Sequence, residues 1–435
     1  MELENLKIAF HTLGCKVNIY ESEVMMQEAQ RAGAVLVPFT EKADVYVVNT
    51  CTVTNTADKK SRSYLRRVRK LNPDAVVAAC GCFPETAGEE AVRETGADLI
   101  IGNRDKERFV RILSDYLNRG ILPAEPADEL KKPRLAGLSG HTRADVKVQD
   151  GCNQFCSYCI IPYARGRIRS RAVNDILEEL EALTSCGVQE VVLTGIHLSS
   201  YGKDDPEAPD DALLRMIEAV HALPGVKRIR LGSLEPRIVT EEFAARLSAL
   251  DKICPHFHLS LQSGCAETLK RMNRHYTPEE YRKSCEILRQ YFDDPAITTD
   301  VIVGFPGETD EEFESSARFV EEIGFYELHV FRYSRRKGTV ADRMKDQIPE
   351  SVKQERSAVL IALGGRMSQA YRMRYEGKKA EVLTEQPGRL EGERVLFGYT
   401  KEYIRAAVPE SCGENKVVRG KLLASSDPEL MKLEV

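Results

Sequence analysis

The sequence predicts an α/β protein with three parts: a doubly wound parallel domain, an open (β/α)6 partial barrel of the TIM type, and a small antiparallel β-barrel. Two long segments alternate short apolar runs with amphipathic stretches, which is typical of parallel sheets covered by helices. The last segment has short strand-like runs between Gly and Pro turns. These patterns place domains at 1–117, 142–345 and 373–435, with a Pro/Gly-rich linker at 118–141 and a connecting helix at 346–372.

In the first domain, three of the predicted strands end directly at cysteines. The strand runs lie at 7–13, 35–39, 45–49, 75–79 and 99–102, with helices at 21–31 and 57–71. Cys15, Cys51 and the pair Cys80 and Cys82 follow the first, third and fourth runs. Because the carboxyl ends of parallel strands line one crevice, these cysteines are expected to meet at one edge. Geometry alone leaves two interpretations open: a metal site, or buried strand-end cysteines that pack in the core.

The second domain contains six predicted strands separated by helical patterns. The strands lie at 146–149, 191–196, 228–234, 256–262, 299–305 and 328–333, and helices are expected at 175–185, 212–222, 278–290 and 311–323. Six βα units are too few for a closed eight-stranded barrel and suit an open one. Polar and glycine residues gather after the strand ends, where such barrels carry functional groups: Thr194, Gly195, His197, Ser233, Glu235 and Gly304. This rim is the predicted active site.

The most specific motif is the C-x3-C-x2-C run of Cys152, Cys156 and Cys159, directly after the first barrel strand. Zinc sites and ferredoxin-type clusters normally use four protein ligands. Three cysteines can hold a 4Fe–4S cluster with one iron open, and the amino and carboxylate groups of S-adenosylmethionine (SAM) can bind that iron. The alternatives are a chance group of thiols or a three-thiolate zinc site, and the flanking sequence favours the cluster.

The order of these parts resembles the radical SAM methylthiotransferase family across almost the whole chain. The motifs that carry the resemblance are TLGCKVN at 12–18, VNTCTVT at 48–54, GC at 81–82, and the stretch 148–171 around the Cys triplet. The resemblance implies an N-terminal three-cysteine domain, a radical SAM barrel and a C-terminal TRAM domain. Residues 16–18 and 163–171 are most similar to the branch that acts on threonylcarbamoyladenosine in tRNA. That branch adds a methylthio group at C2 of this adenosine, at position 37 next to the anticodon.

The resemblance also implies the cofactors and their ligands. It implies SAM and two 4Fe–4S clusters, one on Cys152, Cys156 and Cys159 and one on Cys15, Cys51 and Cys82. Cys80 makes the last of these motifs a C-x-C, and Cys82 is preferred because it fills the Gly-Cys position. The implied SAM contacts are Thr194, Gly195, Ser233, Glu235 and Gly304. C2 of adenine carries an unactivated hydrogen, so radical chemistry supplied by a cofactor is required.

Two basic runs are candidate phosphate contacts, although the net charge is -5. They are Lys59, Arg62, Arg66 and Arg69 in one predicted helix and Arg165, Arg167, Arg169 and Arg171 after the Cys triplet. A solvated charged surface is the alternative, but two runs flanking the proposed site favour RNA. The implied partners are tRNA, a sulfur donor, and an electron donor such as flavodoxin or ferredoxin.

Composition places this chemistry in the cytoplasm. Twelve cysteines without a signal peptide indicate a reducing compartment. No apolar stretch approaches the ~20 residues of a membrane span, so no membrane partner is expected. Three other functions remain open: methylthiolation of isopentenyladenosine in tRNA, methylthiolation of an aspartate in a ribosomal protein, and metal-stabilised RNA binding without turnover.

Overall fold

The computed structural model describes residues 3–119 and 142–435, so the predicted linker lies outside the described residues from position 120 on. The chain divides into two compact units, which are described separately. Unit 1 comprises Met1–Ala136, Asp150–Arg169 and Ser334–Asp342, and unit 2 comprises Gly137–Gln149, Ser170–Tyr333 and Arg343–Val435. In the parts of the chain that the structure describes, we find no helix with the length and apolarity to cross a membrane.

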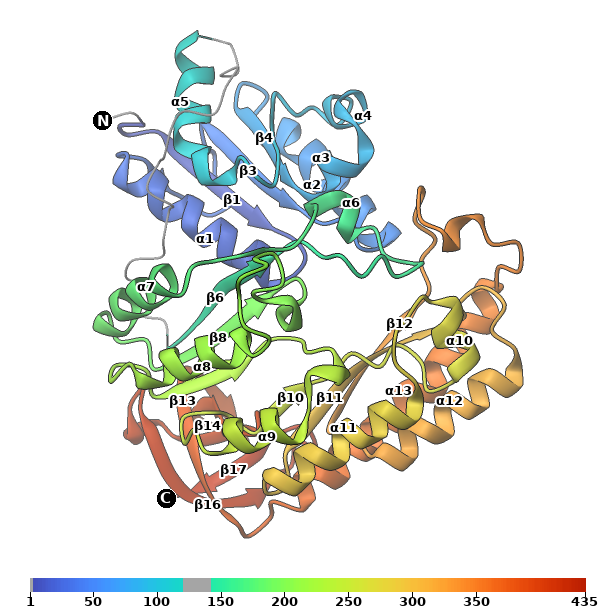
Figure 1. The fold of residues 1–435 in the computed structure, drawn as a ribbon. Coiled ribbons are helices and arrows are strands. Elements are labelled where there is room, and N and C mark those ends of the chain that lie inside the picture. Colours follow the sequence, from blue (N-terminus) through green and yellow to red (C-terminus); the bar gives the residue numbers. More distant parts are fainter. Residues whose placement is uncertain (1–2, 120–141) are drawn as a thin grey trace. The chain divides into compact units, whose positions relative to one another are not determined.

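Unit 1 is built on a five-stranded parallel sheet with the order β2-β1-β3-β4-β5, which confirms the predicted doubly wound fold (Figure 1). The strands are β1 (Lys7–Thr12), β2 (Val35–Leu36), β3 (Val45–Thr50), β4 (Val76–Gly81) and β5 (Leu99–Ile101). The helices are α1 (Lys16–Arg31), α2 (Asn55–Leu71), α3 (Cys82–Ala87), α4 (Glu89–Arg93), α5 (Phe109–Arg119) and α6 (Ile161–Arg165). Helix α1 begins earlier than the predicted residue 21, because Cys15 is already its N-cap.

Two hydrophobic cores lie on the two faces of this sheet. Alternate strand residues such as Val47 and Val48 belong to different cores, as the two-residue period of a strand requires. One core includes Met25 of α1, and the other includes Leu65 of α2. Helix α2 starts where Thr54 caps it, its hydroxyl accepting the backbone N–H of Ala57 at 3.1 Å.

Unit 2 carries the six predicted barrel strands in two parallel groups. They are β6 (Arg143–Asp150), β8 (Glu190–Gly195), β9 (Arg228–Leu231), β10 (His256–His258), β11 (Ala296–Val303) and β12 (Glu327–Arg332), with short β7 (Arg169–Ser170) beside β6. The pairs β6–β8–β9 and β10–β11–β12 are parallel, and single parallel bridges Ile229–Ile253 and Leu234–Leu259 connect the two groups. The helices between them are α7 (Val173–Ser185), α8 (Ala212–Ala222), α9 (Glu241–Ser248), α10 (Ala266–Arg271), α11 (Pro278–Tyr291) and α12 (Asp310–Ile323).

Strand β10 is shorter than the predicted run at 256–262, and tyrosine side chains explain the difference. The hydroxyl of Tyr276 donates to the carbonyls of Ser260 and Leu261, and that of Tyr281 donates to the carbonyl of Leu259. These carbonyls therefore bond to side chains where a regular ladder would use backbone N–H groups.

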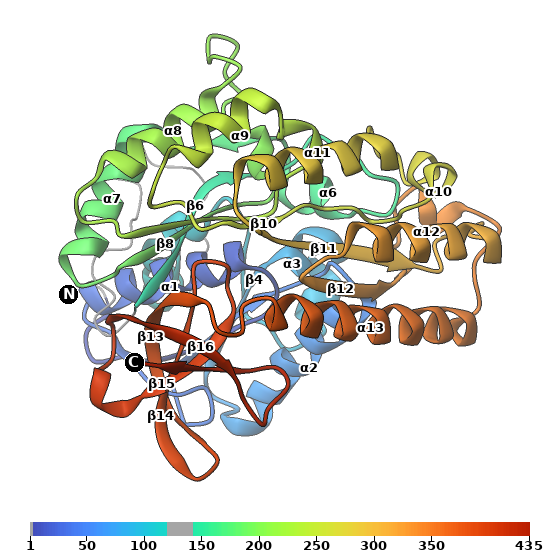
Figure 2. The same cartoon turned by 90° about the horizontal axis from the view of Figure 1, so that it is seen from below.

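After α13 (Glu350–Met373), the chain forms the predicted C-terminal β-barrel, with β13 to β16 labelled in Figure 2. Five strands close this barrel in the order β13-β14-β15-β17-β16. They are β13 (Lys379–Leu390), β14 (Glu393–Tyr399), β15 (Arg405–Pro409), β16 (Val417–Ala424) and β17 (Met431–Glu434). All neighbouring pairs are antiparallel except β15–β17, which is parallel. In the short β17, Met431 and Leu433 are the buried positions.

Candidate metal and cofactor site

The three strand-end cysteines of unit 1 lie at the carboxyl edge of the sheet, after the neighbouring strands β1, β3 and β4. Cys15 caps α1, Cys51 follows β3, and Cys82 opens α3. Burial raises the pKa of the Cys51 thiol to about 11, and the thiols of Cys82 and Cys15 add to this shift. Binding of a metal to such thiols releases their protons.

Two neighbouring residues make this close approach possible. A Cβ on Gly14 would lie 2.9 Å from Cβ and 3.0 Å from Sγ of Cys51, and the φ of +103° also favours glycine. The side-chain amide of Asn18 donates to the carbonyls of Leu13 at 2.7 Å and Thr50 at 2.9 Å. Asn18 thus connects the chain just before Cys15 to the chain just before Cys51. The sequence motif that contains Asn18 did not indicate this role.

The structure separates Cys80 from Cys82. Cys80 is part of the hydrophobic core, its Sγ donates to the Val48 carbonyl at 3.7 Å, and burial raises its pKa to about 12. Cys82 lies on the other side of Gly81 at the start of α3, and its Sγ accepts from Asn103 at 3.9 Å. Cys82, and not Cys80, interacts with the thiols of both Cys15 and Cys51. This arrangement favours Cys82 as the third ligand.

The Cys triplet lies in unit 1, in a tight loop that precedes α6. Gly151 at its start has a φ of +70°, and a Cβ there would lie 1.9 Å from the Arg167 carbonyl, so only glycine fits. The backbone N–H of Cys152 donates to the Gly166 carbonyl at 3.1 Å, which closes the loop. Cys152 and Cys156 are buried, and Cys159 is partly exposed.

A third segment of unit 1, Ser334–Asp342, bonds to the loops that carry the two cysteine sets. Arg336 donates to the side chains of Thr52 at 2.5 Å and Asn55 at 2.8 Å, just after Cys51. The backbone N–H of Ala341 donates to the carbonyl of Ser157 in the triplet loop at 2.8 Å. The segment therefore braces the loops that carry the cysteines.

Arg165 corrects a prediction, because it is buried and cannot reach a phosphate. Its guanidinium donates to Glu21 at 2.9 and 3.1 Å, to Asp150 at 3.0 Å and to Asn18 at 2.6 Å. Lys106 also pairs with Glu21, at 2.5 Å. Burial raises the pKa of Cys82, and the positive charges of Arg165 and Lys106 oppose that rise.

The other predicted RNA contacts fall into three groups. Arg69 bonds to the Gly96 and Ala75 carbonyls and pairs with Asp98, and Arg171 of unit 2 pairs with buried Glu179 at 2.6 Å, so both are structural. Arg169 is half-buried against Asp150 at 3.3 Å. Exposed or partly exposed positions remain at Lys59, Arg62, Arg66 and Arg167.

In unit 2 the predicted rim residues lie at or after the carboxyl ends of barrel strands. Thr194 and Gly195 end β8, Ser233 and buried Glu235 follow β9, and Gly304 follows β11. A Cβ on Gly195 would lie 2.8 Å from Oε1 of Gln149, which accepts the backbone N–H of His197 at 2.8 Å. A Cβ on Gly304, whose φ is +70°, would meet Lys353 at 2.2 Å. Both glycines are thus required by close packing, whatever they bind.

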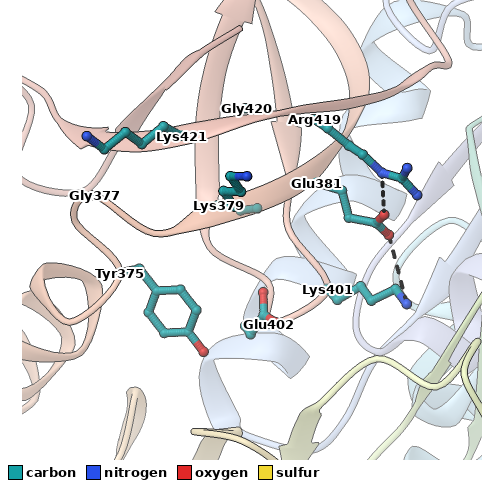
Figure 3. Close-up of a pocket in the computed structure, with 10 residues that line it drawn as sticks. Tyr375, Gly377, Lys379, Glu381, Lys401, Glu402, Arg419, Gly420 and Lys421 are labelled. Atoms are coloured by element: carbon teal, nitrogen blue, oxygen red, sulfur yellow. Dashed lines mark ion pairs between the residues drawn. The ribbon is translucent and has the colours of Figure 1, made fainter.

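The C-terminal barrel of unit 2 has a pocket of about 950 Å³ with a basic lining. Lys379, Lys401, Arg419 and Lys421 line it together with two glutamates. Glu381 pairs with Arg419 at 3.5 Å and with Lys401 at 3.9 Å (Figure 3). The remaining positive charge is suited to an anion.

Comparison with known proteins defines the class first. Residues 146–320 match the family described as the radical SAM superfamily, and residues 7–102 match one described as uncharacterized protein family UPF0004. Among solved structures, the radical S-adenosylmethionine methyltransferase TsrM from Kitasatospora setae has a TM-score of 0.59 at 18% identity, covering 78% of this chain and 77% of that one. That likeness shows the fold alone, which is the fold of a radical SAM enzyme.

Closer relatives define the family. The threonylcarbamoyladenosine tRNA methylthiotransferase of Bacillus subtilis (strain 168) is 41% identical, covering 97% of this chain and 94% of that protein. The protein of the same name from Thermotoga maritima is 36% identical, over 96% and 95%. A tRNA-2-methylthio-N(6)-dimethylallyladenosine synthase of Caldicellulosiruptor saccharolyticus is 35% identical, over 95% and 89%. The chain belongs to the radical SAM methylthiotransferase family.

Proposed function

We propose that the chain converts N6-threonylcarbamoyladenosine in tRNA to its 2-methylthio derivative, at the adenosine next to the anticodon. The observation that carries the proposal is the 41% identity, over nearly the full length of both chains, to a relative named for this substrate. The first relatives named for dimethylallyladenosine are 35% identical.

The donor sets fit the cofactors that this reaction needs. Each set offers three thiols, which is one fewer than a closed zinc or ferredoxin site uses. Cys152, Cys156 and Cys159 would hold one 4Fe–4S cluster, and Cys15, Cys51 and Cys82 a second one. When bound, the clusters and SAM supply the radical and methylthio-transfer chemistry.

The chain's own residues position these groups. Gly14 leaves room for Cys51, Asn18 fixes the chain before two cysteines, and Gly151 lets the triplet loop close. The buried ion pair of Glu21 with Arg165 attaches α1 to the helix that follows the triplet, and Lys106 also pairs with Glu21. In unit 2, we assign SAM contacts to Thr194, Gly195, Ser233, Glu235 and Gly304, the rim positions of the barrel.

We assign RNA contacts to Lys59, Arg62, Arg66 and Arg167 of unit 1, which are not fully buried. We also assign them to the basic pocket of the C-terminal barrel, the TRAM-like domain at 373–435. The reaction further requires an electron donor of the flavodoxin or ferredoxin type and a sulfur donor. Because the proposed substrate is tRNA, we also infer a cytoplasmic location for the protein.

Mass spectrometry of tRNA nucleosides tests the proposal. A strain that lacks the protein should accumulate threonylcarbamoyladenosine without its methylthio group, while isopentenyladenosine derivatives stay unchanged. The wild-type gene should restore the modification, and a gene carrying Cys156→Ala should not. Loss of methylthiolated isopentenyladenosine instead would keep the chemistry and overturn the substrate.

A further inference from the structure

Three potential metal ligands that belong to neither cysteine set converge in unit 2. His258 lies in β10, Asp300 in β11 and His329 in β12. One ligand atom from each of the three side chains lies within 4.8 Å of the others. His258 and Asp300 are partly buried and His329 is exposed, so the group can be reached from solvent.

The strand register puts the three side chains on one face of the sheet. His258 is paired with Thr298, and Asp300 is paired with His329. Thr298 and Asp300 are two residues apart in β11 and so share a face. The intervening Thr299 bonds to Tyr281 of α11, and a Cβ on Gly364 of α13 would lie 3.1 Å from Leu328, the neighbour of His329. These helix contacts therefore lie on the opposite face of the sheet from the cluster.

One hydrogen bond orients His258 as a ligand. Its Nδ1 lies 3.0 Å from the hydroxyl of Thr298, and its Nε2 lies 3.4 Å from Oδ2 of Asp300. A charged N–H···O hydrogen bond is normally about 2.7–2.9 Å long, so the second distance is too long for a tight ion pair. In most metal sites, one ring nitrogen of a histidine ligand binds the metal and the other forms a hydrogen bond that fixes the ring. Here Nδ1 forms that hydrogen bond, and Nε2 faces Asp300.

We propose that His258, Asp300 and His329 form a 2-His-1-carboxylate site for a divalent transition-metal ion such as Fe2+, Mn2+ or Zn2+. Two imidazoles and one carboxylate suit these ions, and the set contains no thiolate that would favour an iron–sulfur cluster. Three protein ligands on one side of the ion leave coordination positions open for water or for an anionic oxygen ligand. The site does not depend on the proposed function, because it uses none of the cysteines.

Binding of Mn2+ to the reconstituted holoenzyme tests the site. In the holoenzyme the cysteines are occupied by iron, and the electron paramagnetic resonance signal of free Mn2+ reports how much of the ion is bound. We expect about one bound Mn2+ per chain, displaced by Zn2+, which stands higher in the affinity order. Removing a residue that only hydrogen-bonds to a metal ligand typically lowers metal affinity by about 10–100-fold. Loss of a ligand itself should therefore lower the affinity for Mn2+ by at least about tenfold.

Two variants and one control make the outcome decisive. Asp300→Asn keeps the side-chain shape, and His329→Ala changes an exposed position, so neither should prevent folding; melting temperatures check this. Both should weaken Mn2+ binding. His221→Ala, which removes a His–Asp pair at 2.7 Å elsewhere in unit 2, should leave binding unchanged. Wild-type protein that binds no Mn2+, or folded Asp300→Asn and His329→Ala that bind it as tightly as wild type, would overturn the site without affecting the methylthiotransferase proposal.

Discussion

Arg165 and Glu21 are 144 residues apart in sequence and form a buried two-pronged ion pair in unit 1, with N–O distances of 2.9 and 3.1 Å. Glu21 belongs to α1, the helix capped by Cys15, and Arg165 ends α6, which follows the Cys triplet. The pair therefore attaches the chain around one cysteine set to the chain around the other. Lys106 and Asp150 complete the charge balance.

This pair should contribute strongly to stability and to cluster retention. Arg165→Ala leaves the carboxylates of Glu21 and Asp150 buried with one cation fewer, which typically costs about 3–5 kcal/mol. Arg165→Ala combined with Glu21→Gln should cost less than the sum of the two single changes, because the partners act together. Urea unfolding of the wild type, the two single variants and the double variant measures this coupling.

Arg93→Ala is the control, because it breaks an exposed pair with Glu89 in the same unit and should change stability little. Additive effects at Arg165 and Glu21 would contradict the interpretation.

Gly14→Ala should remove the proposed N-terminal cluster and leave the one on the triplet. The new Cβ would press on both Cβ and Sγ of Cys51. Reconstituted wild type should hold about eight iron atoms and the variant about four. Gly88→Ala is the matched control, because its φ is also positive, at +82°, but its Cβ would meet nothing within 4 Å. The control should lose only the roughly 1–3 kcal/mol of backbone strain and keep all its iron; equal iron loss in both variants would assign the effect to strain.

Cys82→Ala should lose about half of the bound iron, whereas Cys80→Ala should keep all of it. Cys82 interacts with the other two thiols, whereas Cys80 points into the hydrophobic core. We therefore expect about four iron atoms in Cys82→Ala and about eight in Cys80→Ala. Iron analysis after anaerobic reconstitution checks both proteins. The reverse pattern would move the ligand by two residues along the chain.

The sequence was sufficient to predict the features that follow a regular period or a close spacing. The parallel strands of unit 1, the sheet edge that carries Cys15, Cys51 and Cys82, and the barrel strands all have such a pattern. Arg165 was misinterpreted because exposed and paired arginines look alike in sequence, and its partner Glu21 lies far away in the chain. The His258–Asp300–His329 group was missed for the same reason, since three single residues on three strands have no characteristic spacing.

Exposed basic residues of unit 1 should set the salt dependence of tRNA binding. Lys59 and Arg66 lie on exposed positions of α2, so phosphates can reach them. Reversing each charge should weaken binding of different tRNAs alike and lower the slope of log K against log salt by about one per lost contact. Filter binding at several salt concentrations measures this. Arg318→Glu, at a 65% exposed position of α12 in unit 2, is the control and should leave the slope unchanged; an equal loss there would indicate a general charge effect.

His197 should make the stability of unit 2 depend on pH. Burial, and then the charges of Arg274, Lys203 and Arg237, lower its pKa from 6.5 to about 4. The folded protein therefore keeps this imidazole neutral, while the unfolded chain takes up a proton below about pH 6.5. Because the unfolded state binds the additional proton, the free energy of unfolding should fall as the pH drops from about 7.5 towards 4. The difference of the two pKa values gives a loss of about 2 kcal/mol at pH 5.

Urea unfolding of the cluster-free protein at pH 7.5 and pH 5 measures this loss without any contribution from acid release of iron. His197→Gln keeps a polar side chain beside Ser200, to which His197 bonds at 2.6 Å, but has no proton to gain. A weaker bond to Ser200 lowers the stability of the variant at pH 7.5. Its stability should nevertheless fall less than that of wild type between pH 7.5 and pH 5. The decisive quantity is the difference between those two declines. An identical decline in both proteins would show that other groups, and not the buried imidazole, set the acid sensitivity of the barrel.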